Sequence, residues 1–467
     1  MSRSKAITAA HQAFDSGEFK KLMAARVAIP TESQNPDRAQ ALSDYLTDEM
    51  IPVFKEMGFS TRIFTHPKAR GPFLLAERIE DPALPTILGY GHGDVIRGLD
   101  AEWAEGLSPW TLTERNGRWY GRGIADNKGQ HGINLRAQAA VIETRGKLGF
   151  NAKWIIEMGE ETGSPGLREI CTENRSAFAA DLFVGSDGPR LSEKRPTIFL
   201  GARGAFLVDL VIEARKGGHH SGNWGGLLAN PGIQLAHAIA CIVGPNGQIR
   251  VPEMVPQGGI PEAVREALKD CPVEPGPNDP VIDAHWGEPG LTATEKVYGW
   301  CNFEVLAYET GNPKTPVNAI PPRAWARCQL RHVVGVESQD VIPALRRHLD
   351  RHGFSHVQIQ QTRDENFKAT RLDPGHPAVG FAARSIKTTT GARPAVLPNL
   401  GGALPNDIFS EVLGLPTIWV PHSYPGCSQH APDEHVPAAL VREALGLMAG
   451  LYWDFGDASK AELGIAP

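Results

Sequence analysis

The chain has 467 residues, 41% of them hydrophobic, so it is too long for one ordinary domain and apolar enough for a large core. Its net charge of -6, without a long basic run, argues against nucleic acid or an anionic membrane as partner. Residues 1–19 lack the apolar segment of a signal peptide, and no apolar run is long enough to span a membrane. The 6 cysteines show no CxxC spacing, which suits buried thiols in a reducing compartment, and we expect a cytoplasmic protein.

Strands and helices alternate along the first part of the chain. The apolar patterns predict helices at residues 5–28, 39–57 and 129–145, and strands at 61–64, 73–77, 86–91, 152–157 and 182–185. This alternation predicts an α/β fold with a mainly parallel sheet flanked by helices on both faces. Ligands of such sheets bind beyond the carboxyl ends of the strands. The polar residues expected at or just after strand ends are His92, Asp126, Glu160, Glu161 and Asp187.

The pattern changes near residue 200. Strands are predicted at 205–213, 297–307, 325–331 and 357–360, and helices at 230–242 and 339–351, with an irregular Pro- and Gly-rich loop at 271–290. We interpret this block as a smaller α+β domain inserted into the larger one. The first pattern resumes with a helix at 378–388, a strand at 417–420 and a helix at 438–455. The predicted division is therefore 1–203 and 367–467 for the larger domain and 204–366 for the insert.

The polar residues at the strand ends have the chemistry of a metal site. Imidazole and carboxylate ligands suit zinc, manganese or cobalt better than a thiolate centre does. Two cations would need a shared carboxylate, and Asp126, on a glycine-rich turn at 121–129, is the best candidate. The predicted ligands are His92 and Asp187 for one cation, Glu161 and His430 for the other, and Asp126 for both.

Two further carboxylates are predicted beside these ligands. Asp94 follows His92 by two residues, on the same side of an extended chain, and can accept the hydrogen bond that fixes the imidazole tautomer. Glu160 precedes a predicted ligand but cannot point the same way, so it is free to act as general base on a water molecule.

Each of these signals is weak when taken alone. Asp126 could be only a helix cap, His92 an ordinary histidine at a strand end, and Asp187 a turn residue. The pair at 160–161 could be solvated surface charge. His430 competes with two other histidines of the same Pro-rich loop, His422 and His435. Only the joint order of the residues is specific.

Seven segments in order along the chain resemble the co-catalytic zinc peptidase family, which includes acetylornithine deacetylase, succinyl-diaminopimelate desuccinylase, aminoacylase, carnosinase and glutamate carboxypeptidase. They are Gly91–Val95, Trp119–Gly129, Glu160–Ser164, Ser186–Asp187, His220–Gly226, Gly401–Pro405 and His430–Glu434. The resemblance implies two zinc ions, the ligand roles given above, Glu160 as base and Asp94 as the residue that orients His92. It also implies a cis peptide bond after Asp126 and an insert that acts as a lid and forms a homodimer.

The resemblance implies a second set of residues that contact the substrate. His220 would reach the partner subunit's active site and stabilise the oxyanion, although it could be a surface histidine, and its neighbour His219 is an alternative. Asn318 and Arg331 would hold the substrate's carbonyl and carboxylate; a plain salt bridge is the other reading of Arg331. The turn Gly401–Gly402 would offer backbone N–H groups to the carboxylate end.

The predicted function is therefore metal-dependent hydrolysis of an amide bond in a dipeptide or an N-acyl amino acid with a free carboxylate. A relative that keeps the fold and binds without catalysis is the alternative. A dinucleotide-binding site is disfavoured, because Gly89-Tyr90-Gly91 lacks the helix start and third glycine of that fingerprint. The chain departs from some relatives in having Asn127 instead of a second Asp, and in a long insert at about 245–295, which leaves the substrate's size open.

Overall fold

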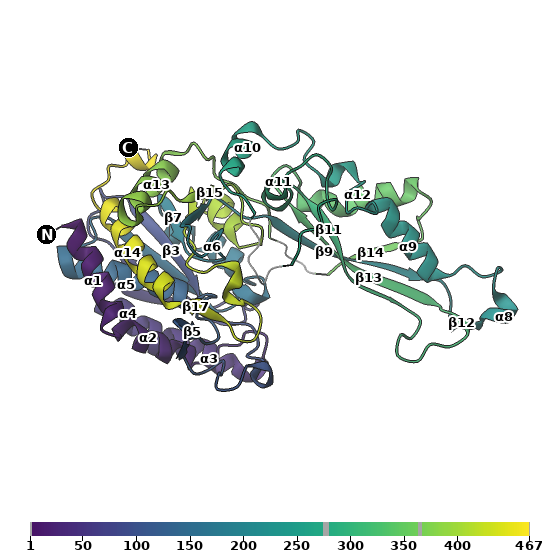
Figure 1. Cartoon of the computed structure of the whole chain (residues 1–467), viewed down its shortest axis with the longest axis horizontal. Coiled ribbons are helices and arrows are strands. Elements are labelled where there is room, and N and C mark those ends of the chain that lie inside the picture. The colour runs from purple at the N-terminus through teal and green to yellow at the C-terminus, as the bar shows by residue number, and fades with distance from the viewer. Residues whose placement is uncertain (1, 274–279, 363–366, 467) are drawn as a thin grey trace.

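The computed structural model describes residues 2–273, 280–362 and 367–466, and shows a large and a small lobe side by side (Figure 1). An eight-stranded sheet of order β1-β2-β6-β3-β7-β16-β8-β15 forms the centre of the large lobe. The strands are β1 (Ser60–Phe64), β2 (Phe73–Arg78), β3 (Thr86–His92), β6 (Asn151–Glu157), β7 (Leu182–Gly185), β8 (Thr197–Phe199), β15 (Ala395–Leu397) and β16 (Thr417–Trp419). Neighbours from β6 through β3 and β7 to β16 are parallel, which confirms the predicted fold class.

Alternate residues of the central strands belong to two separate hydrophobic cores, one on each face of the sheet. Leu74 and Ile156 belong to one cluster, whereas Leu75 and Ile155 belong to the other, as the two-residue period of a strand requires. The first face is covered by α1 (Arg3–Asp15), α2 (Glu18–Val27), α5 (Lys128–Arg145), α13 (Pro377–Thr390) and α14 (Ala438–Phe455). The second face packs against α6 (Leu167–Glu173), α7 (Arg175–Phe178) and α10 (Glu262–Lys269).

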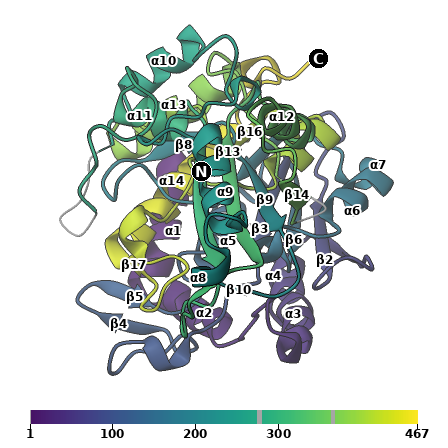
Figure 2. The ribbon, with the colours of Figure 1, turned by 90° about the vertical axis from the view of Figure 1, so that its right-hand side faces the viewer.

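The small lobe is built on a four-stranded antiparallel sheet of order β11-β13-β9-β14. Its strands are β9 (Gly204–Glu213), β11 (Asn302–Thr310), β13 (Arg323–His332) and β14 (Gln358–Gln361), and its core also takes residues from α9 (Pro231–Ile242) and α12 (Ser338–Arg351). At the tip lie β10 (His219–His220), α8 (Ser221–Trp224) and β12 (Ala319–Ile320). Figure 1 shows this tip at the end of the molecule away from the helices of the large lobe, and Figure 2 views the molecule from the tip.

Two predicted elements were wrong in detail. The helix expected at 5–28 is interrupted at Gly17, whose φ of 81° ends α1 and starts α2. The strand expected from Val297 begins instead as helix α11 (Ala293–Tyr298), because Thr292 and Glu295 form a capping box. The helix expected at 39–57 is present as α3 (Ala39–Asp44), a π-helical stretch (Tyr45–Met50) and α4 (Ile51–Glu56).

A three-stranded sheet of β4 (Thr113–Arg115), β5 (Arg118–Tyr120) and β17 (His435–Pro437) joins the turn before Asp126 to the C-terminal segment. No helix within the described residues is both long and apolar enough to cross a membrane. The proposed domain limits at 203–204 and 366–367 stay a prediction; residue 366, and residues 274–279 of the predicted loop and insert, lie outside the described residues.

Candidate metal centre and active site

The turn that carries Asp126 is built around a buried carboxylate, Glu434. One oxygen of Glu434 accepts hydrogen bonds from the backbone N–H of Ala125 at 2.8 Å and of Asp126 at 3.1 Å. The other accepts from the N–H of Gly123 at 3.0 Å and from Arg122 Nη1 at 2.9 Å. Glu434 therefore fixes the backbone from which the Asp126 side chain projects, a role that the sequence alone did not indicate.

The first predicted ligand set comes together at the ends of β3 and β7. His92 is fully buried, and its Nε2 lies 3.2 Å from Asp126 Oδ1 and 3.5 Å from Asp187 Oδ2. These three side chains present one ligand atom each within 4.8 Å of one another. They can therefore hold one cation between them.

The second predicted set forms on the other side of Asp126. His430 Nε2 lies 3.2 Å from Asp126 Oδ2 and 3.0 Å from Glu161 Oε2, so the two oxygens of Asp126 face different histidines. His430 has a φ of 61°, a left-handed conformation that lets its side chain turn from the C-terminal loop toward Glu161. Asp126 has the geometry expected of a bridging ligand.

The electrostatics of the cluster fit two divalent cations. Burial raises the pKa of Glu161 to about 7 and also raises the pKa of Asp187, while hydrogen bonds with Asp126 and Glu161 raise the pKa of His430 to about 11. Glu161 Oε1 and Asp187 Oδ2 are buried, and among the described residues neither oxygen accepts a hydrogen bond. Buried oxygens of this kind require a cation or a donor, so the donor set suits hard or borderline metals such as zinc.

Asp94 and Glu160 stand next to these ligands. The two oxygens of Asp94 accept the backbone N–H groups of Glu160 at 3.1 Å and of Glu161 at 3.2 Å. His92 Nδ1 lies 3.0 Å from the Asp94 carbonyl oxygen and 3.4 Å from its carboxylate, so the shorter of the two contacts is to the backbone of Asp94. Burial raises the pKa of Glu160 well above its usual value, and the neighbouring Asp187 and Glu161 act in the same direction.

The competing histidines have other contacts. His422 Nε2 lies 3.1 Å from both Ser186 Oγ and Asn134 Oδ1, and His435 Nδ1 lies 2.9 Å from the Asp433 carbonyl oxygen. His430 is therefore the histidine of this loop that reaches the cluster. The peptide bond between Asp126 and its successor is cis, as the family resemblance implied.

A third group of ligand-type side chains, Cys241, His348 and His352, lies on the small lobe. His348 Nε2 is 2.8 Å from the Cys241 carbonyl oxygen, and His352 Nδ1 is 2.9 Å from the His348 carbonyl oxygen. The two imidazole rings are tilted by 32° with their centroids 4.3 Å apart, so they also pack against each other. Packing and backbone hydrogen bonds account for this group.

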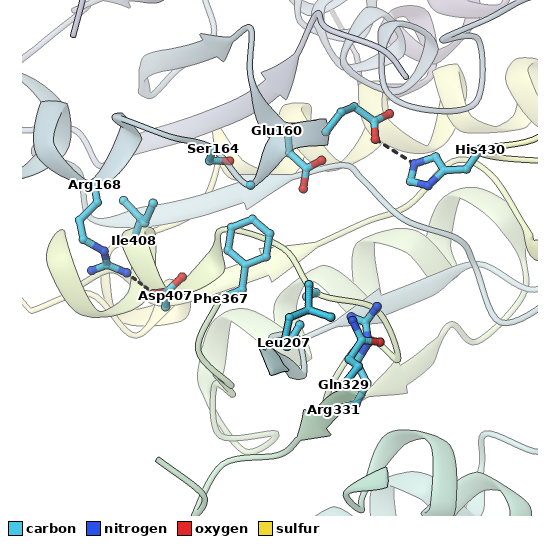
Figure 3. A pocket seen from close by; sticks show the side chains of 15 residues that line it. Glu160, Ser164, Arg168, Leu207, Gln329, Arg331, Phe367, Asp407, Ile408 and His430 are labelled. Carbon is cyan, nitrogen blue, oxygen red and sulfur yellow. Dashed lines mark hydrogen bonds and ion pairs between the residues drawn. The ribbon is translucent and has the colours of Figure 1, made fainter. Parts of the chain in front are cut away.

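A cavity of about 350 Å³ opens beside the cluster (Figure 3). Glu160, Glu161 and His430 line one side, and Arg331 and Gly402 line another. Arg331 Nε donates to Gln329 Oε1 at 3.2 Å. Among the described residues no carboxylate pairs with this guanidinium, so N–H donors remain for a ligand. Gly401 does not line the cavity; its carbonyl accepts Arg203 Nε at 2.9 Å.

His220 and Asn318 lie away from this cavity, at the tip of the small lobe (Figure 1). His220 Nδ1 accepts the N–H of Gly222 at 3.1 Å, and the Asn318 carbonyl accepts the N–H of Ser221 at 2.9 Å. Within one chain, the structure does not bring these two residues to the metal ligands. His219 packs edge-on against Trp224.

Known proteins are similar to this chain in sequence and in fold. The model of peptidase family M20/M25/M40 matches residues 88–454. The chain is 27% identical to the Beta-Ala-His dipeptidase of Mus musculus over 78% of this chain and 76% of that protein. It is 29% identical to the Cys-Gly metallodipeptidase dug1 of Schizosaccharomyces pombe over 71% and 72%, respectively.

Solved structures support the fold at lower identity. The M20 family metallo-carboxypeptidase Sso-CP2 from Sulfolobus solfataricus superposes with a TM-score of 0.79 at 24% identity, over 94% of this chain and all of that one. Human carnosine dipeptidase 1 gives 0.75 at 23% identity, over 97% and 99%. With the family model spanning most of the chain and the ligand clusters in place, this protein belongs to peptidase family M20/M25/M40 and is a metal-dependent peptidase.

Proposed function

We propose that the protein hydrolyses the amide bond of dipeptides that carry a free carboxylate, with two divalent cations, zinc in the first place and cobalt or manganese as alternatives. The observation that carries this proposal is the pair of ligand sets that share Asp126 at the edge of a cavity that also contains Arg331. The relatives named as dipeptidases favour a dipeptide over an N-acyl amino acid, which the same cavity could accept.

His92 and Asp187 would hold one cation, Glu161 and His430 the other, and Asp126 both. When bound, the cations would polarise the scissile carbonyl and lower the pKa of the attacking water. Glu160, which lines the cavity next to the ligand Glu161, would take the proton from that water and pass it to the leaving amine. A relative that only binds would not need a catalytic base. The presence of Glu160 therefore favours an enzyme over the non-catalytic alternative.

Arg331 and Gly402 would hold the carboxylate of the substrate. A guanidinium binds a carboxylate through two parallel N–H···O bonds, and the backbone of a glycine turn can approach a ligand closely. Both residues line the cavity, so they can fix the scissile bond relative to Glu160. Gly401 would contribute by shaping this turn rather than by contact.

We also propose that the small lobe acts as a lid and forms a homodimer. Its tip carries exposed apolar side chains, among them Leu227 and Val317, each 76% exposed, and the edge strand β11 exposes Leu306 at 54%. Such a surface is typical of an interface. In the dimer, His220 would reach the active site of the other subunit to stabilise the oxyanion, and Asn318 would hold the substrate carbonyl.

Hydrolysis of a mixed panel of dipeptides and N-acyl amino acids by the metal-loaded protein, with detection of the released amino acids, tests the proposal. We expect turnover of dipeptides, and a loss of at least about 100-fold in Glu160→Gln with the metal content unchanged. Wild-type turnover in Glu160→Gln would refute the role of Glu160. Turnover of N-acyl amino acids without turnover of dipeptides would refute the proposed substrate class and identify N-acyl amino acids as the substrates.

A further inference from the structure

The active-site cavity has a second charged end, separate from the metal ligands. Arg168 and Asp407 line it together with Ser164 and Ile408. In Figure 3 this pair lies to one side of Glu160, whereas His430 lies on the other side. The roles assigned above use neither Arg168 nor Asp407.

The two residues come from separate segments of the chain that meet in the cavity lining. Arg168 is the second residue of α6, which starts shortly after the segment that carries Glu160, and the buried Leu167 and Ile170 fix this helix on the sheet. Asp407 follows the turn that contains Gly402. Arg168 Nη2 donates a hydrogen bond to Asp407 Oδ2, so the position of the guanidinium is set from both sides.

The guanidinium is the partner of this ion pair that a ligand can reach. The Arg168 side chain is 31% exposed, whereas the Asp407 side chain is 1% exposed, and its free oxygen Oδ1 is buried. A guanidinium has five N–H donors. Among the described residues, Asp407 is the sole hydrogen-bond acceptor of the Arg168 side chain, so donors remain for a bound molecule.

The cavity therefore contains two guanidinium groups, Arg168 and Arg331, at different places, with the apolar Leu207, Phe367 and Ile408 among its lining (Figure 3). A dipeptide with an uncharged side chain has one carboxylate, which Arg331 alone can bind. A second guanidinium, already oriented by Asp407, matches a second carboxylate.

We infer that Arg168 is a specificity-determining residue that binds the side-chain carboxylate of a dipeptide containing aspartate or glutamate. This inference rests on the proposed function, in which Arg331 takes the main-chain carboxylate. The alternative is that Arg168 and Asp407 only join the two segments that meet in the cavity lining. That alternative predicts effects on stability, but none on the choice between an acidic side chain and its uncharged amide.

Isothermal titration of the metal-loaded Glu160→Gln protein separates the two readings, because binding is then measured without turnover. The ligands are Gly-Glu against Gly-Gln and Glu-Gly against Gln-Gly, so the two pairs also identify the position of the acidic residue. We expect one acidic dipeptide to bind about 10-fold or more tightly than its amide, the difference that a charge-assisted hydrogen bond gives.

Adding Arg168→Gln to this protein should bring the ratio of the two affinities, acidic dipeptide to amide, close to one. Adding Arg168→Glu should instead make Gly-Lys or Lys-Gly bind more tightly than the acidic dipeptide. The glutamine variant covers the case in which Arg168→Glu fails to fold beside Asp407. Arg442→Gln is the matched control, since Arg442 forms a two-point ion pair with Asp15 on the outer surface, and it should leave the ratio unchanged.

Equal affinities for acid and amide in the parent protein, or the same ratio with and without Arg168, would overturn the inference. The ratio does not depend on catalysis. Failure of the proposed function would instead appear as absence of dipeptide turnover in the wild-type protein, so the two failures are distinguishable.

Discussion

Replacing Glu434 by glutamine should destabilise the protein more than any loss of a surface charge. The Glu434 and Arg122 side chains are each 1% exposed and lie 2.9 Å apart, so the pair is shielded from water. Glutamine removes the countercharge of Arg122. It also replaces one carboxylate oxygen, which accepts two N–H donors, by an NH₂ group that cannot accept either.

The size of the expected loss in stability follows from the charge of Arg122, which remains buried without its partner. Removing one partner of a buried ion pair costs about 3–5 kcal/mol, because the other partner keeps its desolvation penalty. The carbonyl of Ala431, which accepts Arg122 Nη2 at 3.0 Å, offsets part of this loss, so we expect the lower end of the range. The turn that holds Asp126 should loosen at the same time, and bound metal should fall.

Denaturant unfolding in the presence of a chelator measures the free energy of unfolding without the contribution of bound metal. Metal analysis of the untreated variant then reports on the site. Glu143→Gln is the control, because its ion pair with Arg136 is at the surface, and removing such a pair costs at most about 1 kcal/mol. A loss below about 1 kcal/mol in Glu434→Gln, with metal content unchanged, would refute the view that this carboxylate builds the turn.

Two further predictions concern the shared ligand and the dimer. Asp126→Asn should lose both cations, whereas a variant of a ligand to one site, Asp187→Asn, should keep one; equal stoichiometry by metal analysis would contradict the bridging role. If His220 acts in the other subunit, mixing inactive Glu160→Gln with inactive His220→Ala should restore activity, because a mixed dimer contains one site with both residues intact; no recovery after confirmed subunit exchange would exclude this role.

The sequence was sufficient where a single strand fixes a residue. His92 ends β3 and Asp187 follows β7; these are neighbouring parallel strands whose carboxyl ends meet at one edge of the sheet, so strand prediction alone implied that the two residues are close. The prediction of secondary structure from the sequence failed where a local, short-range contact decides the conformation. Gly17 interrupts a continuous apolar pattern, and the capping box at Thr292 turns the start of a predicted strand into a helix.

The residues that hold the ligands in place were harder to find than the ligands. Arg122 and Glu434 stand in two of the motifs, but nothing in their spacing shows that they pair across 312 positions of sequence. A sequence motif also does not show which of its side chains are buried. Asp407 and Arg168 belong to segments with no obvious chemistry, and only the cavity places them beside Glu160.

The C-terminal segment controls the metal centre in two ways. In the proposed centre His430 would supply a ligand, while Glu434, four positions later, holds the backbone of Asp126, and β17 follows directly and pairs with β5. The ligand and the support of the shared carboxylate therefore arrive together when this segment docks. Both proposed ligand sets contain Asp126, so the support that Glu434 gives to its backbone affects both. Cation binding should consequently stabilise the docked segment, and loosening of the segment should release both cations rather than one.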